Sequence, residues 1–236
     1  VSNLFLSSTL YGISLSGIIL FLSIGYFFSI LNQNKQGYRK LSDDEVKKIE
    51  LSIMDYIHNI CQKNNINYSL AYGTLLGAVR HNGFIPWDDD IDIALVRQEY
   101  DKLYKAIEKD NNKIYKVVWY KNNSNYPYPF YRVYDSRTVY ENGYINSDIE
   151  LGICVDVFPF DTYKDVSNEM RRLDTFRQLS VYTFYGIRDK NSMLSNVLRY
   201  LLVLIFRCTR VKSWNKKMNE LSKKESKYEY IDYLME

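Results

Sequence analysis

The spacing of apolar residues first predicts a long amphipathic helix. It begins at Ser42, which forms a capping box with Glu45, and continues to about Asn64. Apolar side chains recur every three or four positions along one side, at Val46, Ile49, Ile53, Ile57 and Ile60. This spacing predicts that one side of the helix packs against the rest of the domain.

Short apolar or alternating runs after this helix predict strands at residues 68–72, 90–96, 115–121, 130–135 and 153–158. Helical segments at 75–80 and 98–110 separate the first three, and the second of these buries Tyr100, Leu103, Tyr104 and Ile107. Helices that alternate with short strands predict a mixed α/β domain with a small mixed sheet flanked by helices. From about residue 167 the pattern is helical again.

The first 34 residues carry no charge, and residues 11–31 form a 21-residue stretch of apolar, aromatic, Ser and Gly residues. That length can span a bilayer. Lys35, Arg39 and Lys40 follow the stretch and no charge precedes it, which predicts that the rest of the chain lies at the cytoplasmic face of the membrane. The alternative is that this pattern reflects where the given sequence begins, at Val1.

A second segment, residues 188–217, has eight Lys or Arg residues and one acid around the apolar run 201–206. Two interpretations are open: a basic helix on an anionic membrane surface, or a core helix with solvated basic flanks.

The net charge and the cysteine positions argue against several classes of protein. The net charge of +3 gives no electrostatic argument for nucleic-acid binding. Cys61, Cys154 and Cys208 are widely separated, which disfavours a disulfide framework or a zinc module and fits separately buried thiols.

The densest chemistry in the chain is an acidic cluster. Asp88, Asp89, Asp90 and Asp92 lie within five residues, and such a group repels itself unless cations or donors compensate it. In a strand, Asp90 and Asp92 project from the same face about 6 to 7 Å apart. Oxygen ligands at that separation favour Mg²⁺ or Mn²⁺. Asp88 and Asp89 alone also fit a solvated acidic turn.

Two further features complete the pattern of a phosphoryl-transfer site. Asp156 stands alone between valines in a predicted strand, and it would join Asp90 and Asp92 if the two strands were neighbours. Gly73 and Thr74 lie between a strand and a helix, where free backbone N–H groups suit a phosphate. This order of features resembles the polymerase-beta type of nucleotidyltransferase fold.

The run from Tyr72 to Asp92, YGTLLGAVRHNGFIPWDDDID, is more specific still. It resembles the signature of the LicD family of phosphocholine transferases, related to the fukutin-type ribitol-phosphate transferases. The segments YRVYD at 131–135 and VDVFPFD at 155–161 resemble later blocks of the same family. The likeness covers residues 41–161 well and the helical remainder only loosely.

The resemblance implies a function and a set of roles. Asp90 and Asp92 would bind the metal, and Asp156 would be the third active-site carboxylate, either a metal ligand or the base for the acceptor hydroxyl. Gly73 and Thr74 would hold the phosphates of a CDP-activated donor, with CDP-choline the first choice. Arg80 would be their charge partner, although pairing with the acidic turn is nearly as well supported. The acceptor would be a sugar hydroxyl of a cell-surface glycan or glycolipid, such as a lipopolysaccharide, teichoic acid or capsule precursor.

Two alternatives remain. The same site could transfer ribitol phosphate or glycerol phosphate, or the chain could be an inactive membrane-bound scaffold. We expect three regions: a membrane-spanning segment with its lead at 1–34, a nucleotidyltransferase-like catalytic core at 41–165, and a helical C-terminal region at 166–236. Family members usually begin near the helix at Leu41 and extend past the position of Glu236, so we expect the C-terminal region to be incomplete.

Overall fold

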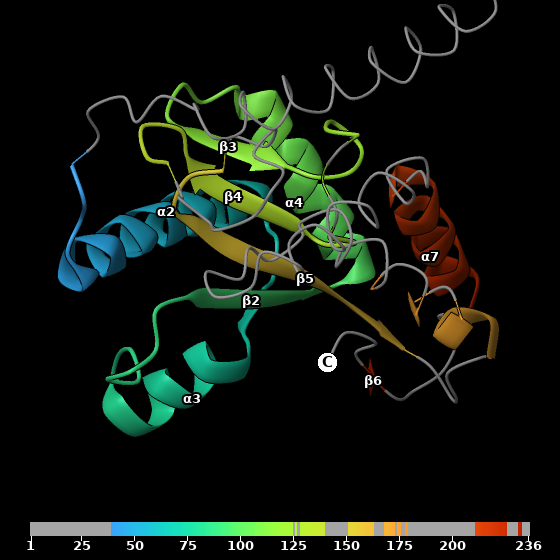
Figure 1. The fold of residues 1–236 in the computed structure, drawn as a ribbon, viewed down its shortest axis with the longest axis horizontal. Helices are drawn as coiled ribbons and strands as arrows, with labels where there is room; N and C mark the ends of the chain where they lie inside the picture. Colours follow the sequence, from blue (N-terminus) through green and yellow to red (C-terminus); the bar gives the residue numbers. More distant parts are fainter. Residues whose placement is uncertain are drawn as a thin grey trace, which may run out of the picture. The chain divides into compact units, whose positions relative to one another are not determined.

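The computed structural model describes residues 39–124, 126, 128–139, 151–162, 168–172, 174, 175, 178, 211–225 and 231–232 (Figure 1). It divides the chain into two compact units, Val1–Lys40 and Leu41–Glu236. The predicted membrane segment at 11–31 lies outside the described residues. Within the described ranges, no helix combines the length and the apolar character that a membrane crossing requires.

The long N-terminal helix is confirmed as α2, Asp43–Asn64. Ser42 caps it: its side chain accepts from the Glu45 amide, and the Glu45 carboxylate accepts from the Ser42 amide. Ile53, Ile57 and Ile60 are buried, as their spacing predicts. The asparagine that follows the helix, Asn65, adopts a left-handed conformation that ends it.

The other predicted elements are present with shifted ends. They are β1 (Ser69–Leu70), α3 (Tyr72–His81), β2 (Ile91–Val96), α4 (Arg97–Asp110), β3 (Tyr115–Val118), β4 (Tyr131–Asp135), β5 (Cys154–Thr162), α7 (Val211–Glu225) and β6 (Ile231–Asp232). The first strand is shorter than predicted because α3 already begins at Tyr72, which has a positive φ of 45°. Gly73 and Thr74 therefore lie in the first turn of α3.

The strands form one mixed sheet in the order β1-β2-β5-β4-β3, and β6 pairs with β5 off this path. β2 and β5 run parallel in the centre, and every other neighbouring pair is antiparallel. The domain is therefore the mixed α/β domain with flanking helices that the sequence predicts.

The two faces of the sheet differ in chemistry. Helices α2 and α4 cover one face, which β2 and β5 line with Ile91, Ile93, Leu95, Val155 and Val157 (Figure 1). Side chains alternate along a strand, so Asp92 and Asp156 project from the opposite face. A smaller apolar cluster of Ala71, Ala94, Phe130 and Phe158 lies on that second face.

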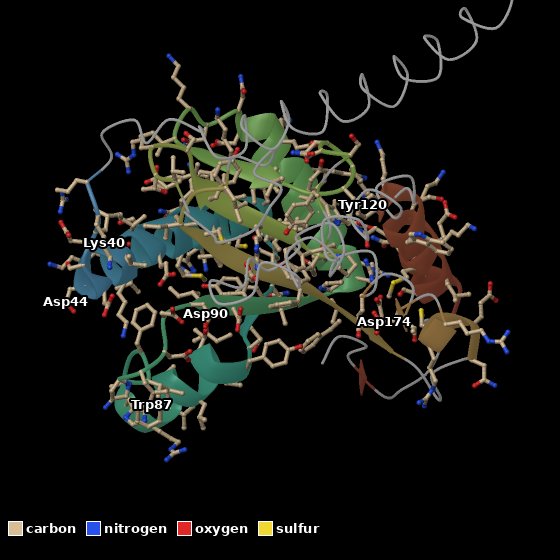
Figure 2. All side chains as sticks on the ribbon, viewed as in Figure 1. Lys40, Asp44, Trp87, Asp90, Tyr120 and Asp174 are labelled. Carbon is tan, nitrogen blue, oxygen red and sulfur yellow. The ribbon has the colours of Figure 1, made fainter. Side chains whose placement is uncertain are left out.

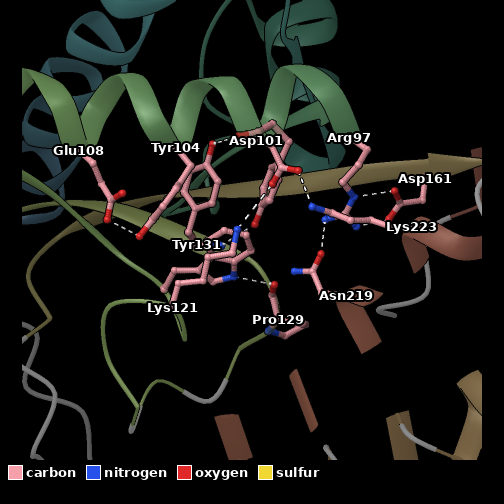
Figure 3. Close-up of polar contacts among 12 residues, drawn as sticks. Arg97, Asp101, Tyr104, Glu108, Lys121, Pro129, Tyr131, Asp161, Asn219 and Lys223 are labelled. Atoms are coloured by element: carbon pink, nitrogen blue, oxygen red, sulfur yellow. Dashed lines mark hydrogen bonds and ion pairs between the residues drawn. The ribbon is translucent and has the colours of Figure 1, made fainter. Parts of the chain in front are cut away.

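Buried aromatic rings join α4 to β4 (Figure 3). Tyr131 donates its hydroxyl to the Tyr100 carbonyl at 3.2 Å, and the Tyr131 amide donates to the Tyr100 hydroxyl at 3.1 Å. Trp119 packs edge-on against Tyr100 and donates its ring N–H to the Pro129 carbonyl at 2.9 Å. Each buried polar group of this cluster thus has a partner, as close packing requires.

Helix α7 is tied to the end of the sheet through Arg97, the first residue of α4 (Figure 3). Arg97 donates from Nε to Asp161 Oδ1 at 2.7 Å and from Nη1 to Asn219 Oδ1 at 2.8 Å. The Asp161 carboxylate and its hydrogen bond raise the pKa of Arg97 against the opposing effect of burial. Of the basic segment at 188–217, only residues 211–217 are described. This part belongs to α7, where Asn215 is buried and Lys212, Lys216 and Lys217 are exposed, and the apolar run 201–206 lies outside the described residues.

We expect Arg97→Met to lower the free energy of unfolding by about 3–5 kcal/mol, because Asp161, 6% exposed, would keep a buried charge without its partner. Urea denaturation measures this. Lys216→Met, which removes one member of the exposed pair Lys216–Glu220, is the matched control and should cause little change. Equal effects of the two substitutions would contradict the proposed anchoring role of Arg97.

Candidate active site

The site is built on the parallel pairing of β2 with β5. Their register places Asp92 directly beside Asp156 on the same face of the sheet. The condition under which Asp156 would join the other acids, that the two strands are neighbours, is met by this pairing. Asp92 is 9% exposed, and Asp156 has a side-chain exposure of 16%. Two carboxylates from distant parts of the chain therefore share one largely desolvated surface.

Asp90 lies just before β2, in the same alternation as Asp92 (Figure 2). The carboxylate oxygens that lie closest together are those of Asp88, Asp89 and Asp90, within 4.8 Å of one another. The tightest acidic group among the described residues thus differs from the predicted set of Asp90, Asp92 and Asp156. Asp90 belongs to both sets and joins the acidic turn to the strand.

Asp156 is held by an arginine that the sequence analysis did not single out. Arg132 of β4 lies opposite Asp156 in the strand register and donates to both carboxylate oxygens, from Nε at 2.6 Å and from Nη2 at 2.8 Å. The Arg132 guanidinium also lies over the Tyr128 ring, 4.5 Å from its centre. Alternation along β4 was the available signal, because it places a charged residue on the same face as Asp156.

Gly73 and Thr74 lie at the start of α3, beside the acidic strand. The Thr74 hydroxyl accepts from the Asp92 amide at 2.8 Å, so it ties α3 to β2. A Cβ on Gly73 would stand 2.4 Å from Asp88 Oδ2, so glycine is required for the Asp88 carboxylate to approach the first turn. The Asp88 carboxylate thus lies against the first turn of α3, where the positive end of the helix dipole favours an acid. Phosphate binding at these two residues stays a prediction.

The structure does not bring Arg80 to the same place. It is exposed in the last turn of α3, seven residues after Gly73, which is about 10 Å along the helix axis. Trp87 directly precedes the acidic turn and is 83% exposed, so it does not pack beneath that turn. Arg132 is therefore better placed than Arg80 to balance charge at the acids.

Aromatic faces for a quaternary ammonium group could come from Tyr126, Tyr128 and Tyr131, and these three side chains have different surroundings. Tyr126 is 1% exposed and Tyr131 is 0% exposed, and Tyr131 lies in the core on the far side of the sheet from Asp156. Tyr128 is only partly buried and stacks with Phe130. Tyr131 is therefore not available to a ligand at the acids, and Tyr128, whose ring lies against the Arg132 guanidinium, is the one beside the site.

A buried carboxyl group, Glu50 of α2, also belongs to the surroundings of the acids. It is 4% exposed, and its Oε2 has no hydrogen-bond partner among the described residues. The apolar spacing of α2 gave no signal for it, because the helix periodicity accounts for Ile49 and Ile53 without it.

Burial and mutual repulsion raise the pKa values of the acids. Burial, then the charges of Asp90 and Asp89, raises the pKa of Glu50 to about 8. Burial, then Asp90 and Asp156, raises the pKa of Asp92 to about 7. Burial, then Asp88 and Asp156, raises the pKa of Asp90 to about 6. Among the described residues, these acids thus repel one another, and the folded state favours their protonated forms.

This donor set fits a hard divalent cation. Every candidate ligand is a carboxylate oxygen, the class that Mg²⁺ and Mn²⁺ prefer. The orphaned oxygen of Glu50 and the raised pKa values both indicate that positive charge is lacking here. Arg132 is committed to Asp156, so the carboxylates that could hold a cation are those of Asp88, Asp89, Asp90 and Asp92.

We expect the cation-free protein to lose stability as the pH rises from about 4.5 to about 8. The pKa values of Glu50, Asp90 and Asp92 are higher in the folded state than their ordinary 4.5, 3.8 and 3.8, so the folded state binds protons more tightly than the unfolded state over this range. Denaturant unfolding in EDTA at a series of pH values measures the slope. Glu50→Gln should flatten it, whereas Asp55→Asn, an exposed acid on the same helix, should leave it unchanged.

A comparison with family models matches residues 65–185 to the LicD/FKTN/FKRP nucleotidyltransferase domain. A stretch of 64 residues is 52% identical to the lipopolysaccharide cholinephosphotransferase LicD of Haemophilus influenzae, over 27% of this chain and 24% of that protein. Uncharacterized proteins of Rickettsia prowazekii and Rickettsia typhi are 40% identical over 93 residues, which is 35% of this chain and 35% and 30% of theirs.

The chain therefore spans about a quarter to a third of the length of the curated relatives it matches. The family model, in contrast, covers just over half of the chain and includes Gly73, Asp92, Arg132 and Asp156. The chain belongs to the LicD/FKTN/FKRP family.

Proposed function

We propose that this chain carries a nucleotidyltransferase-type catalytic domain that transfers a phospho-alcohol from a CDP-activated donor to a sugar hydroxyl of a cell-surface glycan. Phosphocholine from CDP-choline is our first choice of cargo. The observation that carries the proposal is the register of β2 and β5, which sets Asp92 beside Asp156 on one face. The printed function of the Haemophilus relative supports the choice of cargo and of acceptor.

In this proposal the acids hold a divalent cation, Mg²⁺ or Mn²⁺, through Asp90 and Asp92, with Asp156 as the third carboxylate of the site. When bound, the cation would neutralise the donor phosphates and stabilise charge on the departing CMP. Asp156 accepts two hydrogen bonds from Arg132, so its orientation is already fixed.

Positive charge from the chain itself reaches the donor through Arg132. Its guanidinium holds Asp156 through Nε and Nη2 and adds a positive charge beside the donor phosphates. The amides of Gly73 and Thr74 are the proposed cradle for the phosphates, and binding there requires Asp88 to move from its place beside Gly73. Arg80 remains a candidate for a more distant part of the donor.

The reaction is a displacement at phosphorus. The acceptor oxygen forms a bond to the phosphorus nearest the alcohol, and the bond from that phosphorus to the bridging oxygen breaks and releases CMP. The proton of the acceptor hydroxyl passes to a carboxylate of the site. Ribitol phosphate or glycerol phosphate could be transferred by the same steps, since the acids contact only the shared diphosphate.

We place this activity at the cytoplasmic face of the cell membrane, where the charge pattern around residues 11–31 would put the domain. The alternative of an inactive scaffold predicts no CMP release at all. Phosphorus NMR of the full chain with Mg²⁺, a glycan acceptor and, in turn, CDP-choline, CDP-ribitol and CDP-glycerol would separate these possibilities, because the donor that is consumed identifies the cargo.

Asp92→Asn should reduce CMP release by at least about a thousandfold, because it removes a carboxylate at the centre of the site. The fold should survive, since the substitution also removes like-charge repulsion from Asp90 and Asp156. CMP release and the thermal unfolding midpoint measure the two effects. Asp55→Asn is the matched control, and normal turnover of Asp92→Asn would defeat the proposal.

Arg132→Lys should lower kcat for CMP release by on the order of a hundredfold, because lysine keeps the charge and loses the paired hydrogen bonds. Arg137→Lys makes the same chemical change just after β4, at a side chain that is 61% exposed, and should leave turnover unchanged. If both variants turned over like the wild type, Arg132 would have no part in transfer.

A further inference from the structure

An apolar surface continues from the acids along the polar face of the sheet. In the register of β2 with β5, the pair Asp92 and Asp156 is followed two residues later by the pair Ala94 and Phe158. Both pairs project from the same face, about 6 to 7 Å apart. Ala94 and Phe158 belong to the apolar cluster of this face. A ligand held at the acids therefore has an apolar surface directly beside it.

Tyr72, the first residue of α3, packs on this surface. Its ring lies edge-on to the Phe158 ring, with ring centres 5.3 Å apart and an angle of 87° between the planes. The Tyr72 side chain is 44% exposed, whereas Phe158 is only 9% exposed. Phe158 thus supports the Tyr72 ring from the side of the sheet, and Tyr72 presents aromatic surface to solvent next to the acids.

Two hydrogen bonds fix the backbone around Tyr72 relative to Asp92. Before it, the Ala71 amide donates to the Asp92 carbonyl oxygen at 3.0 Å. After it, the Thr74 hydroxyl accepts from the Asp92 amide at 2.8 Å. Both bonds involve the backbone of one residue, and that residue is an acid of the site. The point at which the Tyr72 ring is attached therefore keeps a constant position relative to this acid.

The backbone conformation of Tyr72 is unusual for a bulky residue. Within the described part of the chain, the non-glycine residues with positive φ are Asn65, Asn82, Asn111 and Tyr72. The three asparagines follow the ends of helices, where a left-handed residue is common. Tyr72 adopts a φ of 45° at the start of a helix instead. Such strained residues are concentrated at functional sites, which indicates a functional reason for the position of this ring.

The surroundings favour a cationic ligand group. Aromatic rings attract cations to their faces. The Tyr128 ring already has a cation of the protein over it, because the Arg132 guanidinium lies 4.5 Å from its centre, and a second cation there would be repelled. Tyr72 adjoins Gly73, where the Asp88 carboxylate approaches the helix, so aromatic surface and negative charge meet at this point. A cation with apolar substituents, such as a quaternary ammonium group, is suited to both.

We propose that Tyr72 is a specificity-determining residue that contacts the trimethylammonium group of choline in the donor. The proposal rests on the proposed function, which supplies CDP-choline and sets its phosphates at Gly73 and Thr74. Only two carbons separate the phosphate oxygen from the nitrogen of choline, so the nitrogen would be within reach of the residue next to this cradle. Ribitol and glycerol carry neutral hydroxyl groups instead, and these gain no cation–π attraction from the ring.

Steady-state CMP release by the full chain with two donors tests this. One donor is CDP-choline, and the other is its analogue in which carbon replaces the quaternary nitrogen, so that a group of nearly the same shape carries no charge. We expect Tyr72→Leu to raise KM for CDP-choline about five- to thirtyfold with kcat nearly unchanged, because the contact is made in the ground state and the transition state alike. KM for the neutral analogue should change by less than about twofold.

Three further variants complete the test. Tyr72→Phe keeps the ring and should keep the wild-type KM for CDP-choline. Tyr72→Asn removes the ring with a residue that tolerates positive φ, so it should show the same difference between donors even if the leucine protein folds poorly. Tyr115→Leu makes the same change in the stacked pair Tyr56–Tyr115, on the edge strand β3, and should leave both KM values unchanged.

Wild-type KM values for both donors in Tyr72→Leu and Tyr72→Asn would overturn the role of Tyr72. So would an equal loss with both donors, since that is the behaviour of a residue that only maintains the fold. The proposed function fails differently. If the wild type consumes CDP-ribitol or CDP-glycerol but not CDP-choline, transfer stands and the choline contact is wrong. If the wild type releases CMP from no donor, both proposals are wrong.

Discussion

The parallel pairing of β2 with β5 is the constraint on which the site depends. Two paired parallel strands run in the same direction with a fixed register, so each residue of one strand lies beside one particular residue of the other. Asp92 and Asp156 are such a pair. A shift of one residue in this register would turn one acid into the core that α2 and α4 cover, at a large desolvation cost. The apolar face of the sheet therefore determines which side chains meet on the polar face.

Bringing these acids together costs electrostatic free energy, and the cationic side chains among the described residues offset this cost only in part. Arg132 balances Asp156, and its aromatic neighbours Tyr128 and Phe130 keep the guanidinium in place. Asp90 and Asp92 remain close to other acids, and their raised pKa values report the resulting repulsion. Repulsion of this kind is usual where a binding site is organised before its ligand arrives.

Much of the fold was predictable from the sequence because its elements follow simple periodicities. The capping box at Ser42, the buried face of α4 and the alternation through Asp92 all have local causes, and all are present. The strand ends were less predictable, because hydrogen bonding across the sheet decides where a strand stops. β5 extends to Thr162, beyond the predicted end at Phe158, since its last residues pair with β6.

The site was predictable only where its residues lie on strands. Asp90, Asp92 and Asp156 could be identified because an acid in an apolar strand is conspicuous. Arg132 was hidden because its role depends on which strand lies beside β5, and Glu50 because a charged residue in an amphipathic helix is ordinarily solvated. Both are long-range properties, and no local pattern in a single sequence specifies them.

The short length of β2 has a mechanical consequence. Asp90 precedes its first residue and Arg97 follows its last, so one six-residue strand joins the acidic centre to the anchor of α7. A shortened chain without α7 would deprive Arg97 of Asn219 and loosen the far end of the same strand. Helix α7 therefore helps to hold in place the strand that carries the acids, although it contacts the opposite end of that strand.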